Sequence, residues 1–70
     1  MIIRDATEKL ISKRALTLKE SQTVMKEMME GIPTPVQVGA FLTALRSKGE
    51  TVEEVAGMAL AMRAFSLKVH

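Results

Sequence analysis

The segment from Thr34 to Gly49 carries a helix start signal, an apolar helical pattern and a helix stop signal in one continuous run. Thr34 is a favoured N-cap residue, and Pro35 suits the first helical position, where its missing N–H costs no hydrogen bond. Arg46 and Lys48 place cations where the helix dipole favours them, and Gly49 tolerates a positive φ. The sequence therefore predicts a central helix that begins at Pro35 and stops at Gly49.

This predicted helix has two different apolar faces. Bulky side chains at helical spacing form one face, which we expect to point into the core: Val38, Phe41, Leu42 and Leu45. Small or weakly polar side chains form a second stripe, free to meet another helix: Val36, Ala40, Thr43 and Ser47. Gly39 lies between them, and since glycine inside a helix costs roughly 1 kcal/mol relative to alanine, it indicates a closely approaching backbone. A helix buried on most sides within one bundle is the alternative.

Two more helices are predicted before the central one. The first covers about residues 3–13, and four side chains should share its buried side: Ile3, Ala6, Leu10 and Ile11. Thr17 and Glu20 form a capping box that opens a second helix, which Gly31 ends. Five residues share one face of this second helix: Leu18, Ser21, Met25, Met28 and Met29. Methionines at this spacing usually fill a core, although an adaptable binding surface is the alternative.

A fourth helix is predicted after the central one. Thr51 and Glu54 repeat the capping box, and the helical pattern reaches about Lys68. Its buried stripe should contain Val52, Val55, Ala59, Met62 and Phe65 or Ser66. Small residues cover much of the rest and allow close packing: Ala56, Gly57, Ala61 and Ala64. No strand is convincingly signalled, so we expect an all-α fold, a small bundle of about four helices forming one domain over residues 1–70.

Composition narrows the possible functions. Seventy residues form a core that barely offsets chain entropy, so help from another domain or subunit is expected. The ten basic and eight acidic residues are interleaved, which argues against a nucleic-acid footprint despite a net charge of +2. Cysteine is absent and no apolar run approaches a membrane span. We therefore expect a cytoplasmic protein with no nucleic-acid or membrane partner.

Candidate catalytic groups are few. The single histidine is His70, so a histidine-centred triad or a multi-histidine metal site cannot be assembled within the chain. Glu53 and Glu54 are adjacent and project in different directions, while Asp5 and Glu8 complement a helix dipole. We expect no catalytic, cofactor-binding or metal-binding residue in this sequence.

The run PVQVGAFLTALRSKGETVEEVAGMALAMR, residues 35–63, closely resembles the N-terminal helical domain of the anthranilate phosphoribosyltransferase family. The resemblance covers essentially the whole chain and extends, more distantly, to the pyrimidine nucleoside phosphorylases. Its most specific parts are Gly31, the run 37–45, Arg46, the run 48–51, Glu53-Glu54, Gly57 and the run 61–63. The combination of Arg46 with the run Lys-Gly-Glu-Thr at 48–51 resembles the anthranilate enzyme more than the phosphorylases.

The resemblance implies that the helical domain and the catalytic groups belong to different parts of a larger enzyme. In that family a small helical domain packs on a large C-terminal α/β domain, whose glycine-rich loop holds phosphoribosyl pyrophosphate with magnesium, and the anthranilate amine displaces pyrophosphate. That loop is not among these 70 residues. The resemblance therefore implies a non-catalytic domain that helps to form the cleft and a homodimer through the second stripe of the central helix. The same domain of a pyrimidine nucleoside phosphorylase, or a free-standing helical adaptor or nucleic-acid-binding module, is the alternative.

Overall fold

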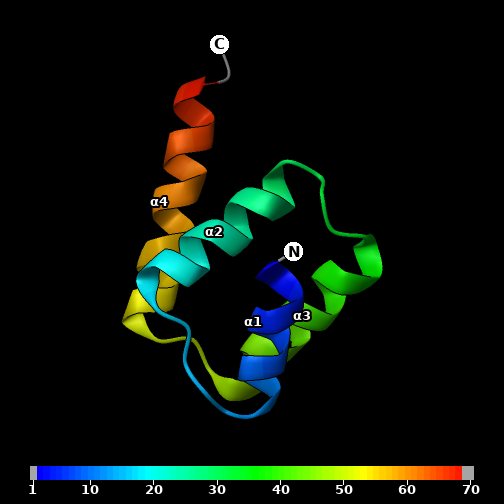
Figure 1. Ribbon diagram of the computed structural model, residues 1–70. Helices are drawn as coiled ribbons and strands as arrows, with labels where there is room; N and C mark the ends of the chain where they lie inside the picture. Colours follow the sequence, from blue (N-terminus) through cyan, green and yellow to red (C-terminus); the bar gives the residue numbers. More distant parts are fainter. Residues whose placement is uncertain (1, 69–70) are drawn as a thin grey trace.

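Four helices make up the regular structure of residues 2–68, the part of the chain that the computed structural model describes. They are α1 (Ile2–Ile11), α2 (Leu18–Met29), α3 (Pro35–Lys48) and α4 (Val52–Lys68). No strand occurs within this described part, so the predicted all-α class is confirmed. Figure 1 shows the N-terminal half of α4 packed beside α2, while its C-terminal half projects beyond the other helices.

Two predicted capping boxes set the starts of α2 and α4. Thr17 Oγ1 accepts a hydrogen bond from the Glu20 N–H at 3.1 Å, and Glu20 Oε1 accepts one from the Thr17 N–H at 2.8 Å. Thr51 and Glu54 repeat the pair at 3.2 and 2.8 Å. Each box satisfies two backbone donors that a helix start otherwise leaves unpaired.

The start of α3 and the C-terminal end of α1 each differ from the prediction in one respect. Thr34 caps α3 as predicted, but it also forms a third capping box with Gln37, at 3.2 and 2.9 Å, which the sequence reading missed. Helix α1 ends at Ile11, two residues earlier than predicted, because Lys13 adopts a positive φ of 65° and the Arg14 N–H bonds back to the Lys9 carbonyl at 2.9 Å. A non-glycine residue thus plays the part usually taken by glycine.

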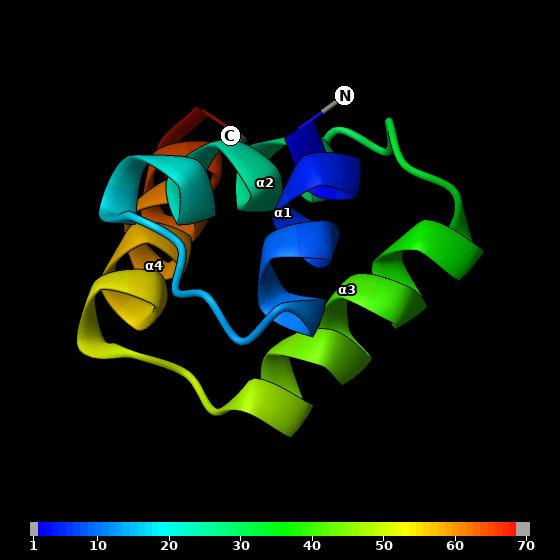
Figure 2. The same ribbon diagram turned by 60° about the horizontal axis from the view of Figure 1, so that its bottom comes forward.

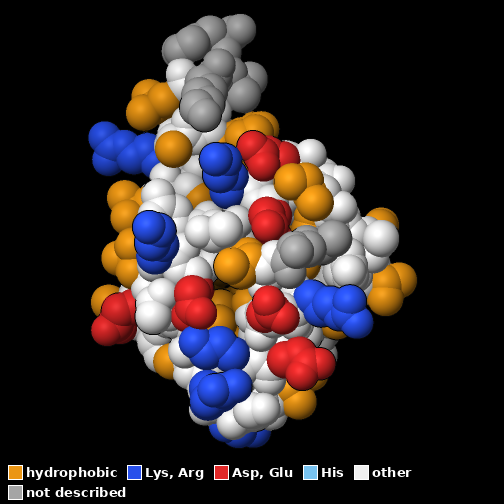
Figure 3. Space-filling view, viewed as in Figure 1, with side chains coloured by type: hydrophobic (Ala, Val, Ile, Leu, Met, Phe, Trp, Pro, Cys, Tyr) orange, Lys and Arg blue, Asp and Glu red, His pale blue; other side chains and the backbone are white. Residues whose placement is uncertain are grey.

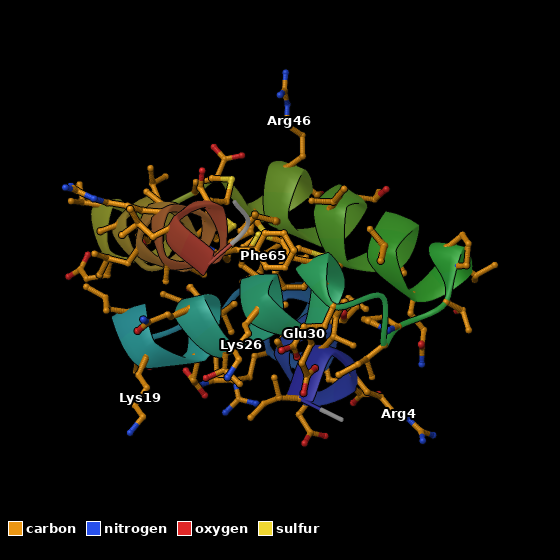
Figure 4. The ribbon with its side chains drawn as sticks, turned by 90° about the horizontal axis from the view of Figure 1, so that it is seen from above. Arg4, Lys19, Lys26, Glu30, Arg46 and Phe65 are labelled. Carbon is orange, nitrogen blue, oxygen red and sulfur yellow. The ribbon has the colours of Figure 1, made fainter. Side chains whose placement is uncertain are left out.

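The helices form two layers. Seen from above, α1 and α2 lie on one side of the molecule and α3 and α4 on the other (Figure 4). The main contacts run between the layers, α2 against α4 and α1 against α3, with a smaller contact between α1 and α2. Seven buried side chains fill the core between them: Ile3, Ala6, Leu10, Leu16, Val24, Phe41 and Leu45.

On the first three helices, three residues predicted for the buried faces are exposed, Ile11, Leu18 and Leu42, and the buried Val24 was missed. Leu42 is 47% exposed because it lies one residue, about 100° of rotation, beyond the fully buried Phe41 on the α3 surface. Ile11 is 67% exposed at the last turn of α1. On α2, Val24 is completely buried, whereas the predicted Met25 and Met29 are only half-buried and Leu18 is exposed.

The prediction for α4 was wrong about which face is buried. The predicted stripe is exposed at all its positions: Val52, Val55, Ala59, Met62, Phe65 and Ser66. The buried positions are instead Glu54, Gly57 and Ala61. A Cβ added to Gly57 would overlap the Leu18 carbonyl oxygen and lie 2.9 Å from the Ser21 Cβ. The side of α4 that carries Gly57 and Ala61 therefore packs closely against α2, because small residues at a helix crossing let the two backbones approach each other.

Candidate functional site

The small-residue stripe of α3 remains uncovered. Its four members, hereafter the α3 stripe, are all exposed: Val36, Ala40, Thr43 and Ser47. They line one groove of about 570 Å³ between α3 and the end of α1. Leu10, Ile11, Lys13, Gly39 and Ala44 complete its lining. The sequence predicted the stripe, but the groove depends on how α1 crosses α3, which the sequence pattern does not specify.

Gly39 lines this groove. The prediction that another backbone segment of the chain approaches Gly39 closely was wrong. A Cβ built at Gly39 meets no heavy atom within 4 Å. Ile11, displaced from the predicted core, instead forms part of the groove wall. Among the described lining residues Lys13 alone is charged, so the groove offers an aliphatic surface with little desolvation cost.

A second groove continues past the end of the stripe. It has a volume of about 560 Å³, shares Thr43 and Ser47 with the first groove, and adds Leu42, Leu45, Arg46 and Glu50. In Figure 4 the Arg46 side chain points away from the body of the molecule. The exposed side of α3 thus changes from aliphatic at its N-terminal end to charged at its C-terminal end.

Glu54 links the two connections near the C-terminal end of α3. This side chain is fully buried, and its Oε1 accepts hydrogen bonds from Lys48 Nζ at 2.9 Å and from the Thr51 N–H at 2.8 Å. Its Oε2 accepts a third from the Leu16 N–H at 2.7 Å. One carboxylate therefore joins the α1–α2 connection to the α3–α4 connection, the two segments brought forward in Figure 2.

The electrostatics of Glu54 follow from these contacts. Burial on its own raises the pKa of Glu54, but the hydrogen bonds from Leu16, Thr51 and Lys48 outweigh it and hold the pKa below 4.5. The Lys48 side chain is only 8% exposed, so this ion pair is sheltered from solvent. The capping box was predictable from Thr51 and Glu54, whereas the third donor comes from 38 residues away.

Two further carboxylates tie α2 to α1. Glu27 accepts hydrogen bonds from the Ile2 and Ile3 N–H groups at 3.3 Å each, which caps the start of α1 from a different helix. Glu20 pairs with Lys9 Nζ at 3.0 Å. The hydrogen bond from the Thr17 N–H, together with Lys9, lowers the pKa of Glu20.

The acidic residues do not form a metal cluster in the part of the chain described. No group of three or more histidine, cysteine, aspartate or glutamate side chains is placed to hold a metal ion among residues 2–68. Glu53 is exposed while Glu54 is buried in its ion pair, so the adjacent carboxylates have separate surroundings. His70 lies outside the described residues. None of the described helices is long and apolar enough to cross a membrane.

Comparison of the sequence with known families identifies the class of this helical domain. The chain belongs to the glycosyl transferase family, helical bundle domain, which it matches over residues 4–66. Within that family it matches the N-terminal helical domain of anthranilate phosphoribosyltransferase, as the sequence resemblance predicted. No solved structure matches the chain.

Three curated relatives illustrate the match, and all are named anthranilate phosphoribosyltransferase. The protein of Dehalococcoides mccartyi is 54% identical over 68 residues, which cover 97% of this chain and 20% of the relative. That of Chloroflexus aurantiacus is 54% identical over 63 residues, 90% of this chain and 19% of the relative. The protein of Hydrogenovibrio crunogenus is 45% identical over 69 residues, which cover 99% of this chain and 20% of the relative. The chain spans about a fifth of the length of these relatives.

Proposed function

We propose that this chain serves as the helical domain of an anthranilate phosphoribosyltransferase of tryptophan biosynthesis, in the cytoplasm. Its tasks are to dimerise and to form one wall of a substrate cleft, and it supplies no catalytic group itself. A C-terminal α/β domain holds phosphoribosyl pyrophosphate with magnesium and carries out the transfer to anthranilate. The identity to anthranilate enzymes over 90% or more of the chain supports this assignment over a nucleoside phosphorylase.

The single observation that carries the dimer proposal is the groove beside the α3 stripe. Val36, Ala40 and Thr43 are exposed along one side of α3, and Gly39 leaves open space between them and α1. Two copies of α3 related by a two-fold axis bring the small side chains of one stripe against those of the other. The slim surface permits close helix contact, and Gly39 then gains the neighbour that its own chain does not provide.

The test places a charge at the centre of the stripe. Thr43→Arg sets two like charges near the two-fold axis without touching the buried Phe41 and Leu45. We expect the unmodified chain to dimerise and the variant to remain helical but monomeric. Light scattering over a concentration series gives the mass, and circular dichroism gives the helix content.

Ser66→Arg is the matched control, because Ser66 is exposed on α4, away from the α1–α3 groove. It should dimerise as the unmodified chain does. A Thr43→Arg chain that still dimerises, or an unmodified chain that is monomeric at high concentration, would remove the α3 stripe as the interface. Loss of the dimer only in Ser66→Arg would move the interface to α4.

A further inference from the structure

A small pocket lies between α2 and the C-terminal half of α4, hereafter the α2–α4 pocket. Its volume is about 260 Å³, and it shares no lining residue with the two grooves beside α3. Figure 3 shows a positive, a negative and hydrophobic side chains next to one another in the region where α4 projects from the body of the molecule. The volume lies below the range of drug-sized ligand sites and is suited to a small organic molecule.

The α4 wall of the pocket is apolar. Ala61 is only 4% exposed and therefore lies at the bottom of the pocket, whereas the Phe65 side chain is 39% exposed and Ala64 is exposed beside it. The half-buried Met29 of α2 adds a thioether to the lining. An aromatic ring and a thioether both favour contact with an aromatic or aliphatic group of a ligand.

The α2 wall carries two opposite charges, Lys26 and Glu30, one helical turn apart. Both side chains are exposed, and within the described part of the chain neither of them takes part in an ion pair. Figure 4 shows the Phe65 side chain between α4 and α2, with Lys26 and Glu30 along α2. The pocket thus combines an apolar wall with one positive and one negative group on the opposite wall.

We propose that the α2–α4 pocket binds a free amino acid with an apolar side chain, in its zwitterionic form. The ligand carboxylate pairs with the Lys26 ammonium, and the ligand ammonium pairs with the Glu30 carboxylate. Gln22 lies one helical turn before Lys26 and lines the same wall, where its amide can donate a hydrogen bond to the ligand carboxylate. The apolar side chain of the ligand lies against Phe65 and Ala61.

Other classes of ligand fit the pocket less well. A phosphorylated molecule would place negative charge beside Glu30, and the lining contains a single cation to offset it. A ligand without charges would leave both Lys26 and Glu30 without a partner. The proposed site does not depend on dimerisation, because the α2–α4 pocket and the α3 stripe have no residue in common.

The experiment titrates amino acids into the isotope-labelled 70-residue chain and follows the amide signals by nuclear magnetic resonance. L-Phenylalanine and L-leucine are the probes, because the apolar wall suits an aromatic or a branched side chain. We expect saturable shift changes in residues 22–30 and 61–65 and none in α3. Two analogues of L-phenylalanine, 3-phenylpropionate without the ammonium and 2-phenylethylamine without the carboxylate, should each bind roughly fivefold more weakly, since one ion pair is lost.

Two charge variants assign the contacts of the zwitterion. Lys26→Met should weaken L-phenylalanine about fivefold but should not weaken 2-phenylethylamine, which has no carboxylate. Glu30→Gln should likewise weaken L-phenylalanine but not 3-phenylpropionate, which has no ammonium. Because each variant is compared with a ligand that lacks the matching charge, a general change in the domain is separated from the loss of one contact.

A matched pair of alanine variants tests the position of the site. Ala64→Leu fills the pocket from an exposed position of α4 and should abolish binding, whereas Ala59→Leu, at an exposed α4 position outside the pocket, should bind as the unmodified chain does. The proposal is overturned if neither amino acid gives saturable shifts, if the shifts lie elsewhere, or if the single-charge analogues bind equally well. Binding that survives Ala64→Leu, or that Ala59→Leu abolishes equally, also overturns it.

Discussion

Glu54 holds three segments of the chain together at a single carboxylate. It accepts hydrogen bonds from Leu16, Lys48 and Thr51, and its folded-state pKa is below the ordinary value of 4.5. A carboxyl group with a lowered folded-state pKa stabilises the fold at pH values above its unfolded pKa. That contribution is lost as the pH falls through the folded-state pKa.

We therefore expect Glu54→Gln to lower the free energy of unfolding at neutral pH by on the order of 3 kcal/mol, since it breaks a buried ion pair. Its stability should also fall less than that of the unmodified chain between neutral pH and about pH 3. Urea denaturation at several pH values measures both effects. Glu53→Gln, at the exposed neighbouring position, is the control and should change neither.

The two helix-interior glycines give opposite predictions. In the Thr43→Arg background, which we expect to be monomeric, Gly39→Ala adds a methyl group where no atom of the chain lies within 4 Å, so it should raise the unfolding free energy by up to about 1 kcal/mol through helix propensity. Gly57→Ala adds the same group against the Leu18 carbonyl and Ser21, and overpacking should cost roughly 2 kcal/mol. Thermal and urea unfolding of both variants provides the comparison, and equal effects would contradict the close α2–α4 contact.

At the scale of the elements, the capping boxes make similar contributions to three helices. We expect Thr17→Ala, Thr34→Ala and Thr51→Ala each to cost about 1 kcal/mol. In a domain of this size each loss lowers the melting temperature by roughly 4–8 °C. Thr23→Ala is the control, because the Thr23 hydroxyl donates to the Lys19 carbonyl within α2 and satisfies no unpaired N–H. Unchanged melting temperatures in all three cap variants would contradict the role of the boxes.

Helix starts were predictable from the sequence because their causes are local. Thr17 and Glu20 are three residues apart, and so are Thr51 and Glu54. The early end of α1 was not predictable, since Lys13 replaces the glycine that normally signals such a turn. Hydrogen bonds between a side-chain oxygen and a backbone N–H three residues away thus explain why these helix starts were predicted correctly.

The buried faces were predicted less well. On α3 the bulky Phe41 and Leu45 identify the core side, but α4 has apolar residues on both sides, and periodicity alone does not choose between them. The choice depends on α2, whose Leu18 and Ser21 admit only a residue without a side chain. In the same way the α3 stripe was predictable from its small residues, while the groove beside it depends on the position of Ile11.

At the scale of the whole molecule, we expect the 70-residue chain to show no phosphoribosyl transfer to anthranilate. It spans about a fifth of its relatives, and Glu20, Glu27 and Glu54 are occupied in capping and ion pairs. An assay with anthranilate, phosphoribosyl pyrophosphate and magnesium checks this, with the full-length Dehalococcoides mccartyi protein as the positive control. Calorimetry should likewise detect no appreciable binding of phosphoribosyl pyrophosphate, and measurable turnover would overturn the proposed division of labour.

The pairing of the helices has a consequence for how the chain assembles. Helix α1 packs mainly on α3 and α2 mainly on α4, so each principal partner is two helices away in the sequence. On the ribosome neither pair can close until the later helix has emerged, and closing these longer loops slows folding relative to a hairpin of neighbouring helices. A chain cut before Pro33, in the connection between α2 and α3, separates α1 and α2 from α3 and α4. Each half then contains one helix of each packed pair. Neither half should fold alone, and mixing the two should restore the native structure.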